Sequence, residues 1–231
     1  MSKPRDVKGD FYLPGRDPVP RTQVVGIYDL VGFTKHLSND ELITAVSSIE
    51  MQVKLVVSRK YWWDERTKKL DQESVLNQVL VRSTGDGYFI AFSHDLEDVE
   101  VLDVLTKLYQ NIQQHHPVRL GINKGNNYVV PDLNKRVNII GWGINLAARA
   151  LQFAEKGQII CTSHFAQPLI KTNGGRFTEE IMQDLGVQHV KHDELNLYNY
   201  HKDKEFGAPL TPAQRKDVKP KKTKRKTTKK N

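Results

Sequence analysis

The sequence lacks the features that would hold its fold covalently or anchor it to a membrane. It has one cysteine among 231 residues, Cys161, so no internal disulfide can form. It has no run of about eighteen uncharged apolar residues, and its start lacks the apolar segment of a secretory signal. We therefore expect a cytoplasmic protein with no membrane span. Its 231 residues are enough to bury a core of their own.

Acidic residues are scarce at the C-terminus. Residues 212–231 contain ten Lys or Arg and one Asp, a net charge of +9. The whole chain carries +8, so residues 1–211 carry −1 and are near neutral. The basic stretch also lacks aromatic side chains that could stack on bases. This pattern favours non-specific attraction to polyanions over specific nucleic-acid binding.

Composition divides the chain into three regions. Residues 1–20 contain four prolines and no apolar periodicity, which is typical of an extended arm. Residues 21–203 alternate apolar stretches with turn signals and predict one folded domain. Residues 204–231 lose apolar content and predict a Lys-rich, disordered tail.

The middle region predicts an α+β domain. Its patterns run strand, helix, strand, strand, helix, strand, which is the βαββαβ order of ferredoxin-like folds, and an added αβ part follows. The first helix is expected to be capped by Asn39 or Asp40. The expected strands lie at 23–29, 75–83, 88–92, 118–122, 158–162, 188–191 and 195–200, and the expected helices have apolar faces over 42–56, 96–112 and 144–151.

Two aspartates stand where strands end. Asp29 ends the apolar run 24–28, and Asp86 lies in an Asp-Gly turn between the apolar runs 79–81 and 88–90. Carboxylates at the ends of neighbouring strands can share two divalent metals, a pair that suits in-line displacement at phosphorus. Either aspartate alone is equally typical of turn chemistry, so the metal interpretation depends on the other motifs.

A third motif lies on the expected helix over 144–151. Asn145 and Arg149 are four residues apart and therefore share a helix face. A guanidinium one turn from an amide suits phosphate and ribose oxygens, although a surface Arg and a solvated Asn have the same spacing.

Together these segments resemble the class III nucleotide cyclases. The resemblance spans about residues 22–200, with the motifs in the family's order and spacing. The matching segments are Asp29–Thr34, Thr84–Gly87, Arg119–Gly125, Gly141–Arg149 and Gly157–Ile160.

The resemblance implies a role for each motif. Asp29 and Asp86 would hold two divalent ions, Mn²⁺ or Mg²⁺, with the carbonyl of Leu30 as a further ligand. Asn145 would orient the ribose of a nucleoside triphosphate. Arg149 would neutralise charge on the α-phosphate as pyrophosphate leaves.

Further expectations come from the same resemblance. Phe33 would close over the phosphates, and Lys191 would bind the triphosphate. In the family each site lies between two subunits, the metal-binding aspartates coming from one and the Asn and Arg from the other. A chain that carries both halves is therefore expected to form a homodimer with two equivalent sites.

Two positions that select the base in the family depart from its pattern. Adenylyl cyclases carry Lys and Asp there and guanylyl cyclases carry Glu and Cys, whereas this chain has Arg82 and Asn138. Arg82 offers donors only, and Asn138 offers an acceptor and donors. Uracil, with two carbonyl acceptors around an N–H donor, is satisfied by this pair. Cytosine is satisfied if Asn138 turns its oxygen to the amino group. The amino group of adenine and the N1–H and N2–H₂ groups of guanine would need a stronger acceptor, such as a carboxylate, than Asn138 offers.

A short cyclase with these substitutions resembles the pyrimidine cyclases of bacterial Pycsar anti-phage systems. The resemblance implies a phosphorus–oxygen lyase that makes cyclic UMP, or as second choice cyclic CMP, and signals to a cyclic-nucleotide-sensing effector in antiviral defence. The main alternative is a conventional adenylyl or guanylyl cyclase. A nucleotide-binding module without catalysis is disfavoured, because both aspartates, Asn145 and Arg149 are all present.

Overall fold

The computed structural model describes residues 19–32, 38–57, 63–64, 69–70, 79–92, 96–132, 137–172, 175–190, 193–202, 207–212 and 214. None of the helices in this part of the chain is long and apolar enough to cross a membrane. The elements are β1 (Arg21–Leu30), α1 (Asn39–Val57), β2 (Trp63–Asp64), β3 (Lys69–Leu70), β4 (Val79–Ser83), β5 (Gly87–Phe92), α3 (Asp98–Gln113), β6 (Val118–Pro131), β7 (Val137–Gly141), α4 (Trp142–Phe153), β8 (Ile159–Thr162), α5 (Ser163–Thr172), β9 (Met182–Val190) and β10 (Asp193–Tyr200).

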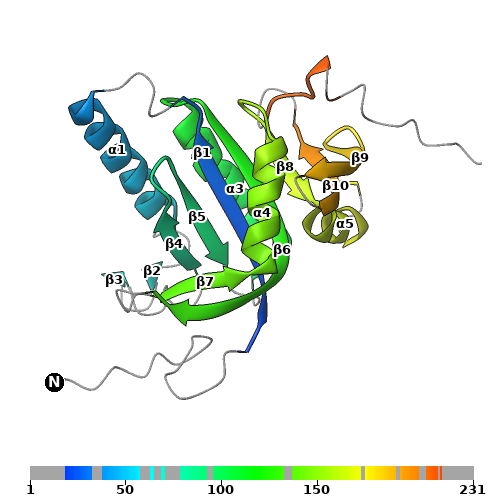
Figure 1. Cartoon of the computed structure of the whole chain (residues 1–231), viewed down its shortest axis with the longest axis horizontal. Helices are drawn as coiled ribbons and strands as arrows, with labels where there is room; N and C mark the ends of the chain where they lie inside the picture. The colour runs from blue at the N-terminus through cyan, green and yellow to red at the C-terminus, as the bar shows by residue number, and fades with distance from the viewer. Residues whose placement is uncertain are drawn as a thin grey trace, which may run out of the picture.

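An eight-stranded sheet forms the centre of the molecule. Its strand order is β4-β5-β1-β6-β8-β10-β9, and β7 pairs with the outer half of β6. The pairs are antiparallel except for β6 with β8. The order of β1, β4, β5 and β6, with α1 and α3 between them, is ferredoxin-like, and β8 to β10 with α5 extend it (Figure 1). The predicted α+β fold is confirmed.

Helices cover both faces of the sheet, because β1 is apolar on both sides. Val24 and Tyr28 belong to the core formed with α1 and α3. Val25 and Ile27 belong to a second core on the opposite face, under α4. Figure 1 shows α4 in front of the sheet and α3 behind it. Burial raises the pKa of Tyr28, whose hydroxyl stays protonated and donates to the carbonyl of Leu105 at 2.7 Å.

The structure corrects the predicted start of α1. Ser38, and neither Asn39 nor Asp40, caps this helix. The Ser38 backbone N–H donates to Glu41 Oε2 at 2.8 Å, and the Glu41 N–H reaches Ser38 Oγ at 3.4 Å. This is a capping box, in which two residues three apart satisfy each other's backbone donors.

The strand predicted over 118–122 is much longer in the structure. β6 continues to Pro131, and its outer half pairs with β7, which was not predicted. The middle of this strand, residues 123–127, reads Asn-Lys-Gly-Asn-Asn and has little intrinsic strand propensity. It is extended because β1 pairs with it, with Gln23 opposite Gly125 and Arg21 opposite Asn127. The helix α5 was also missed.

Part of the predicted tail packs against the domain. Ala208 and Pro209 hydrogen-bond to Gly157 and Gln158, between the end of α4 and the start of β8. The side chain of Gln214 is buried, and its Oε1 accepts from Gln158 Nε2 at 2.8 Å. Its Nε2 donates to the carbonyl of Phe153 at 3.2 Å. The packed domain therefore reaches Gln214, beyond the predicted boundary at residue 203.

Candidate active site

Strand register brings the two aspartates together. Asp29 lies opposite Gly87 in the β1–β5 pair, and the Leu30 N–H donates to the carbonyl of Asp86 at 3.0 Å. The hairpin that carries Asp86 turns through Gly85, which has a φ of +98° that suits glycine. A Cβ at Gly87 would lie 1.9 Å from the Tyr28 carbonyl oxygen, so only glycine allows this close approach.

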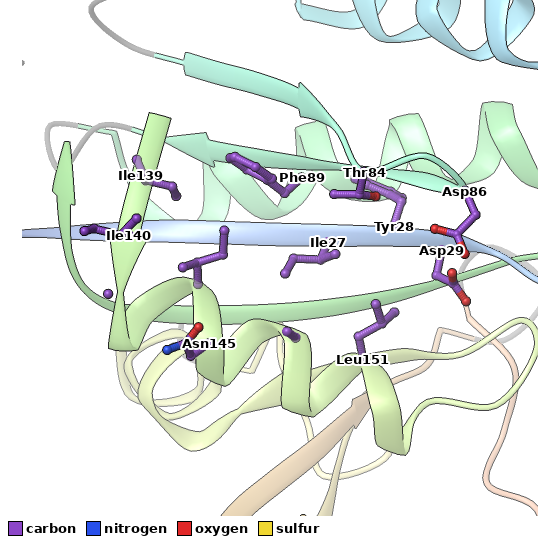
Figure 2. Close-up of a pocket in the computed structure, with 13 residues that line it drawn as sticks. Ile27, Tyr28, Asp29, Thr84, Asp86, Phe89, Ile139, Ile140, Asn145 and Leu151 are labelled. Carbon is purple, nitrogen blue, oxygen red and sulfur yellow. The ribbon is translucent and has the colours of Figure 1, made fainter. Parts of the chain in front are cut away.

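These aspartates line one end of a cavity of about 510 Å³ between the sheet and α4. Figure 2 shows the carboxylates of Asp29 and Asp86 close together there, beyond an apolar floor that includes Ile27 and Phe89. Asp86 is exposed and Asp29 is half-buried. The cavity therefore opens beside a concentrated negative charge.

Sequence reasoning missed the partner of Asp29. Arg119 lies directly opposite Asp29 in the β1–β6 register, and its Nε donates to Asp29 Oδ2 at 2.7 Å. Its Nη1 also donates to the carbonyl of Ala154 at 3.1 Å. The ion pair orients the Asp29 carboxylate and offsets part of the negative charge. Only the alignment of β1 with β6 could have revealed it, because the two residues are ninety positions apart.

The donor set fits a hard divalent cation. Two carboxylates and a nearby backbone carbonyl, that of Leu30, are the oxygen ligands that Mg²⁺ and Mn²⁺ prefer. Within the described residues no group of three or more His, Cys, Asp or Glu is placed to hold a metal. The coordination of a metal held by these two carboxylates would therefore be completed by backbone, water or phosphate oxygens.

Asn145 and Arg149 lie on α4, as predicted. Asn145 lines the cavity, but toward the end opposite to the aspartates, with its amide directed away from them (Figure 2). The guanidinium of Arg149 lies 5.8 Å from the ring centroid of Trp142, a cation–π distance. Within one chain the structure therefore does not bring Asn145 up to Asp29 and Asp86.

The predicted base-selecting residues lie near each other. Arg82 on β4 donates to the carbonyl of Val137 on β7, the residue before Asn138. Its Nη1 also donates to its neighbour's carbonyl, Val81, at 3.2 Å. Asn138 Oδ1 accepts from the N–H of Ile139 at 2.8 Å. Both side chains are half-buried and held by backbone groups.

Two predicted residues fall outside the described part of the chain. Phe33 follows β1, and Lys191 lies between β9 and β10. Their roles stay predictions.

Comparison with known proteins identifies the fold. No protein-family model and no curated protein matches the sequence. Among solved structures, the guanylate cyclase domain of RhGC from Catenaria anguillulae, in complex with GTP, is 17% identical with a TM-score of 0.61, over 78% of this chain and 96% of that one. The adenylyl cyclase CyaB from P. aeruginosa is 17% identical with a TM-score of 0.59, over 83% and 100%.

A third solved structure, the adenylate/guanylate cyclase/hydrolase from Silicibacter pomeroyi, is 20% identical with a TM-score of 0.56, over 80% of this chain and 99% of that one. The chain thus has the fold of the class III adenylyl and guanylyl cyclase catalytic domains, and it spans nearly the whole of each neighbour.

Proposed function

We propose that the protein is a nucleotide cyclase, a phosphorus–oxygen lyase that converts a nucleoside triphosphate to the 3′,5′-cyclic monophosphate and pyrophosphate. One observation carries the proposal: Asp29 and Asp86 lie together at the mouth of an open cavity, on a sheet with the cyclase fold. The solved neighbours are named for cyclase activity, and one of them is a complex with GTP.

The reaction forms a bond from the ribose 3′-oxygen to the α-phosphorus and breaks the bond to the bridging oxygen, which leaves with pyrophosphate. Two bound Mn²⁺ or Mg²⁺ ions would lower the pKa of the 3′-hydroxyl and carry triphosphate charge. Asp29 and Asp86, with the Leu30 carbonyl, would hold those ions. Asn145 would orient the ribose, and Arg149 would stabilise the charge that develops on the α-phosphate.

A second copy of the chain would complete the site. The amide of Asn145 is directed away from the aspartates of its own chain. Exposed apolar side chains surround the start of α4: Ile140 is 55% exposed, Trp142 63%, and Tyr128, opposite Ile140 in the β6–β7 pair, 37%. A homodimer would cover this surface and carry Asn145 and Arg149 to the partner's carboxylates.

For the substrate we propose a pyrimidine triphosphate, UTP first and CTP second. Arg82 and Asn138 depart from both the adenylyl and the guanylyl pairs. Nε of Arg82 is buried with no hydrogen-bond partner among the described residues, so a base carbonyl that reached it would satisfy a donor that these residues leave unpaired. A conventional adenylyl or guanylyl cyclase is the second candidate, because the neighbours are named for those activities. The cytoplasmic location, the effector and the role in antiviral defence stay predictions.

Competition between nucleotides tests this choice. Purified protein with Mn²⁺ and equal amounts of ATP, GTP, CTP and UTP is expected to give mainly cyclic UMP, identified by mass. Arg82→Ala should lower the use of UTP about ten- to a hundredfold, since an unpaired buried base group costs roughly 1–3 kcal/mol.

Arg176→Ala is the matched control, since this surface arginine pairs with Asp103 away from the cavity. It should leave the product ratio unchanged. A product that is mainly cyclic AMP or cyclic GMP would overturn the pyrimidine assignment, and cyclic CMP would reverse the order of the two pyrimidines.

A further inference from the structure

One face of β6 alternates glycine with asparagine beneath α4. Gly121, Asn123, Gly125 and Asn127 are two residues apart and share that face. A Cβ at Gly121 would lie 2.5 Å from the backbone of Ala147 and Leu151, and one at Gly125 would lie 3.1 Å from Gly143 Cα. The glycines thus let the helix lie directly on the strand.

The asparagines bond to the first turn of that helix. Asn123 Nδ2 donates to the carbonyl of Gly143 at 2.9 Å, and Asn127 Oδ1 accepts from the N–H of Ile144 at 2.8 Å. The N-cap residue of α4, Gly141, has no side chain to supply such a bond. Asn127 therefore caps the helix from the neighbouring strand.

Gly143 and Asn127 fit each other closely. A Cβ on Gly143 would lie 2.4 Å from Asn127 Nδ2, so a larger residue at 143 would displace the cap. The first turn of α4 is thus fixed by contact as well as by hydrogen bonds.

A third buried residue orients Asn123. Thr162 Oγ1 on β8 donates to Asn123 Oδ1 at 2.5 Å. Asn123 and Asn127 are fully buried, and Thr162 is 1% exposed. Buried amides are costly unless they are hydrogen-bonded, and an apolar residue would fill a sheet interior at lower cost. The presence of two buried amides is therefore explained by the first turn of α4, which their hydrogen bonds hold in place.

We propose that Asn123 and Asn127 are positioning residues. They set the distance of α4 from the sheet and the rotation of α4 about its own axis, as catalysis requires. Ile144, whose N–H is capped, directly precedes Asn145, and Arg149 follows one turn later. A shift of the first turn would move both side chains together. The proposal rests on the proposed function for its link to turnover, but the anchor itself can be tested without activity.

Asn127→Ala removes the cap, whereas Asn127→Asp keeps an acceptor oxygen in the same place. Asn127→Ala is expected to lower kcat roughly ten- to a hundredfold, the size of effect that a displacement of about 1 Å produces, while KM changes less than about threefold. Hydrogen exchange at the Ile144 amide should become faster. Asn127→Asp keeps the acceptor but brings a carboxyl group into a fully buried site, so its Tm should fall while exchange at Ile144 stays slower than in Asn127→Ala.

Asn199→Ala is the matched control. Asn199 is also fully buried, but on β10 it bonds to Gln183 and to the carbonyl of Ala208, away from the start of α4. The Tm of the Asn199→Ala protein should fall, while its kcat and its hydrogen exchange at Ile144 stay near wild type. Thr162→Val, which replaces the hydroxyl with a methyl group, removes the bond that orients Asn123 and is also expected to lower kcat, which keeps the positioning role testable if Asn127→Ala does not fold.

The two proposals can fail separately. Wild-type protein without cyclase activity would overturn the proposed function, while faster exchange at Ile144 would still support the anchor. Unchanged exchange at Ile144 in a folded Asn127→Ala protein would overturn the anchor, as would a wild-type kcat in Thr162→Val if Asn127→Ala does not fold. In an active enzyme, a kcat loss in Asn127→Ala no larger than that in Asn199→Ala would overturn the positioning role.

Discussion

Asp86→Asn is expected to lower cyclisation by roughly a thousandfold or more, because several kcal/mol of charge stabilisation would depend on the cations that Asp86 is proposed to hold. The fold should persist. Asp86 is exposed, and it contacts β1 through its backbone carbonyl, which the substitution keeps. The measurements are product formation, Mn²⁺ affinity and Tm.

Asp103→Asn is the matched control for this substitution. Asp103 is an exposed carboxylate on α3 that pairs with Arg176, so the variant removes the same charge outside the cavity that holds Asp29 and Asp86. Its activity should equal that of the wild type. An Asp86→Asn enzyme that cyclises at the wild-type rate would refute the assignment of the metal site.

Mixing two inactive variants should restore activity if the site is shared between subunits. Asp29→Ala loses a proposed metal ligand and Arg149→Ala loses the proposed transition-state cation, so each homodimer would lack part of both of its sites. A heterodimer has one intact site, made of Asp29 and Asp86 from one chain and Asn145 and Arg149 from the other. We expect up to about a quarter of wild-type activity after full subunit exchange, since half of the dimers are mixed and each has one of two sites.

Subunit exchange must be shown independently, for example with differently labelled chains. Two Asp29→Ala preparations mixed in the same way provide the control and should stay inactive. If proven exchange restored no activity, the site would lie within one chain, and the separation of Asn145 from the carboxylates would need rearrangement of α4.

The sequence predicted features that depend on local pattern. Asp29 ends an apolar run and Asp86 lies in an Asp-Gly turn, so the ends of β1 and β5 were placed before any pairing was known. The capping residue of α1 was wrong by one or two positions, because Ser38, Asn39 and Asp40 all suit a cap and only the Glu41 contact distinguishes them.

Features that depend on tertiary pairing could not be predicted. The ion pair of Arg119 with Asp29 needs the β1–β6 register, and β7 is a strand through its pairing with residues 127–131 of β6. The cap from Asn127 to Ile144 joins a strand to a helix seventeen residues later. Gln214, which directly precedes the Lys-rich stretch, is held by hydrogen bonds to Gln158 and Phe153.

The most direct test of the account is the chemical outcome of a single reaction. Purified protein is incubated with Mn²⁺ and UTP labelled at the α-phosphate, and the nucleotide product and pyrophosphate are both quantified. The account predicts 3′,5′-cyclic UMP and pyrophosphate in equal molar amounts, and neither product with Asp86→Asn. Linear UMP, UDP or an oligonucleotide as the main product would contradict it.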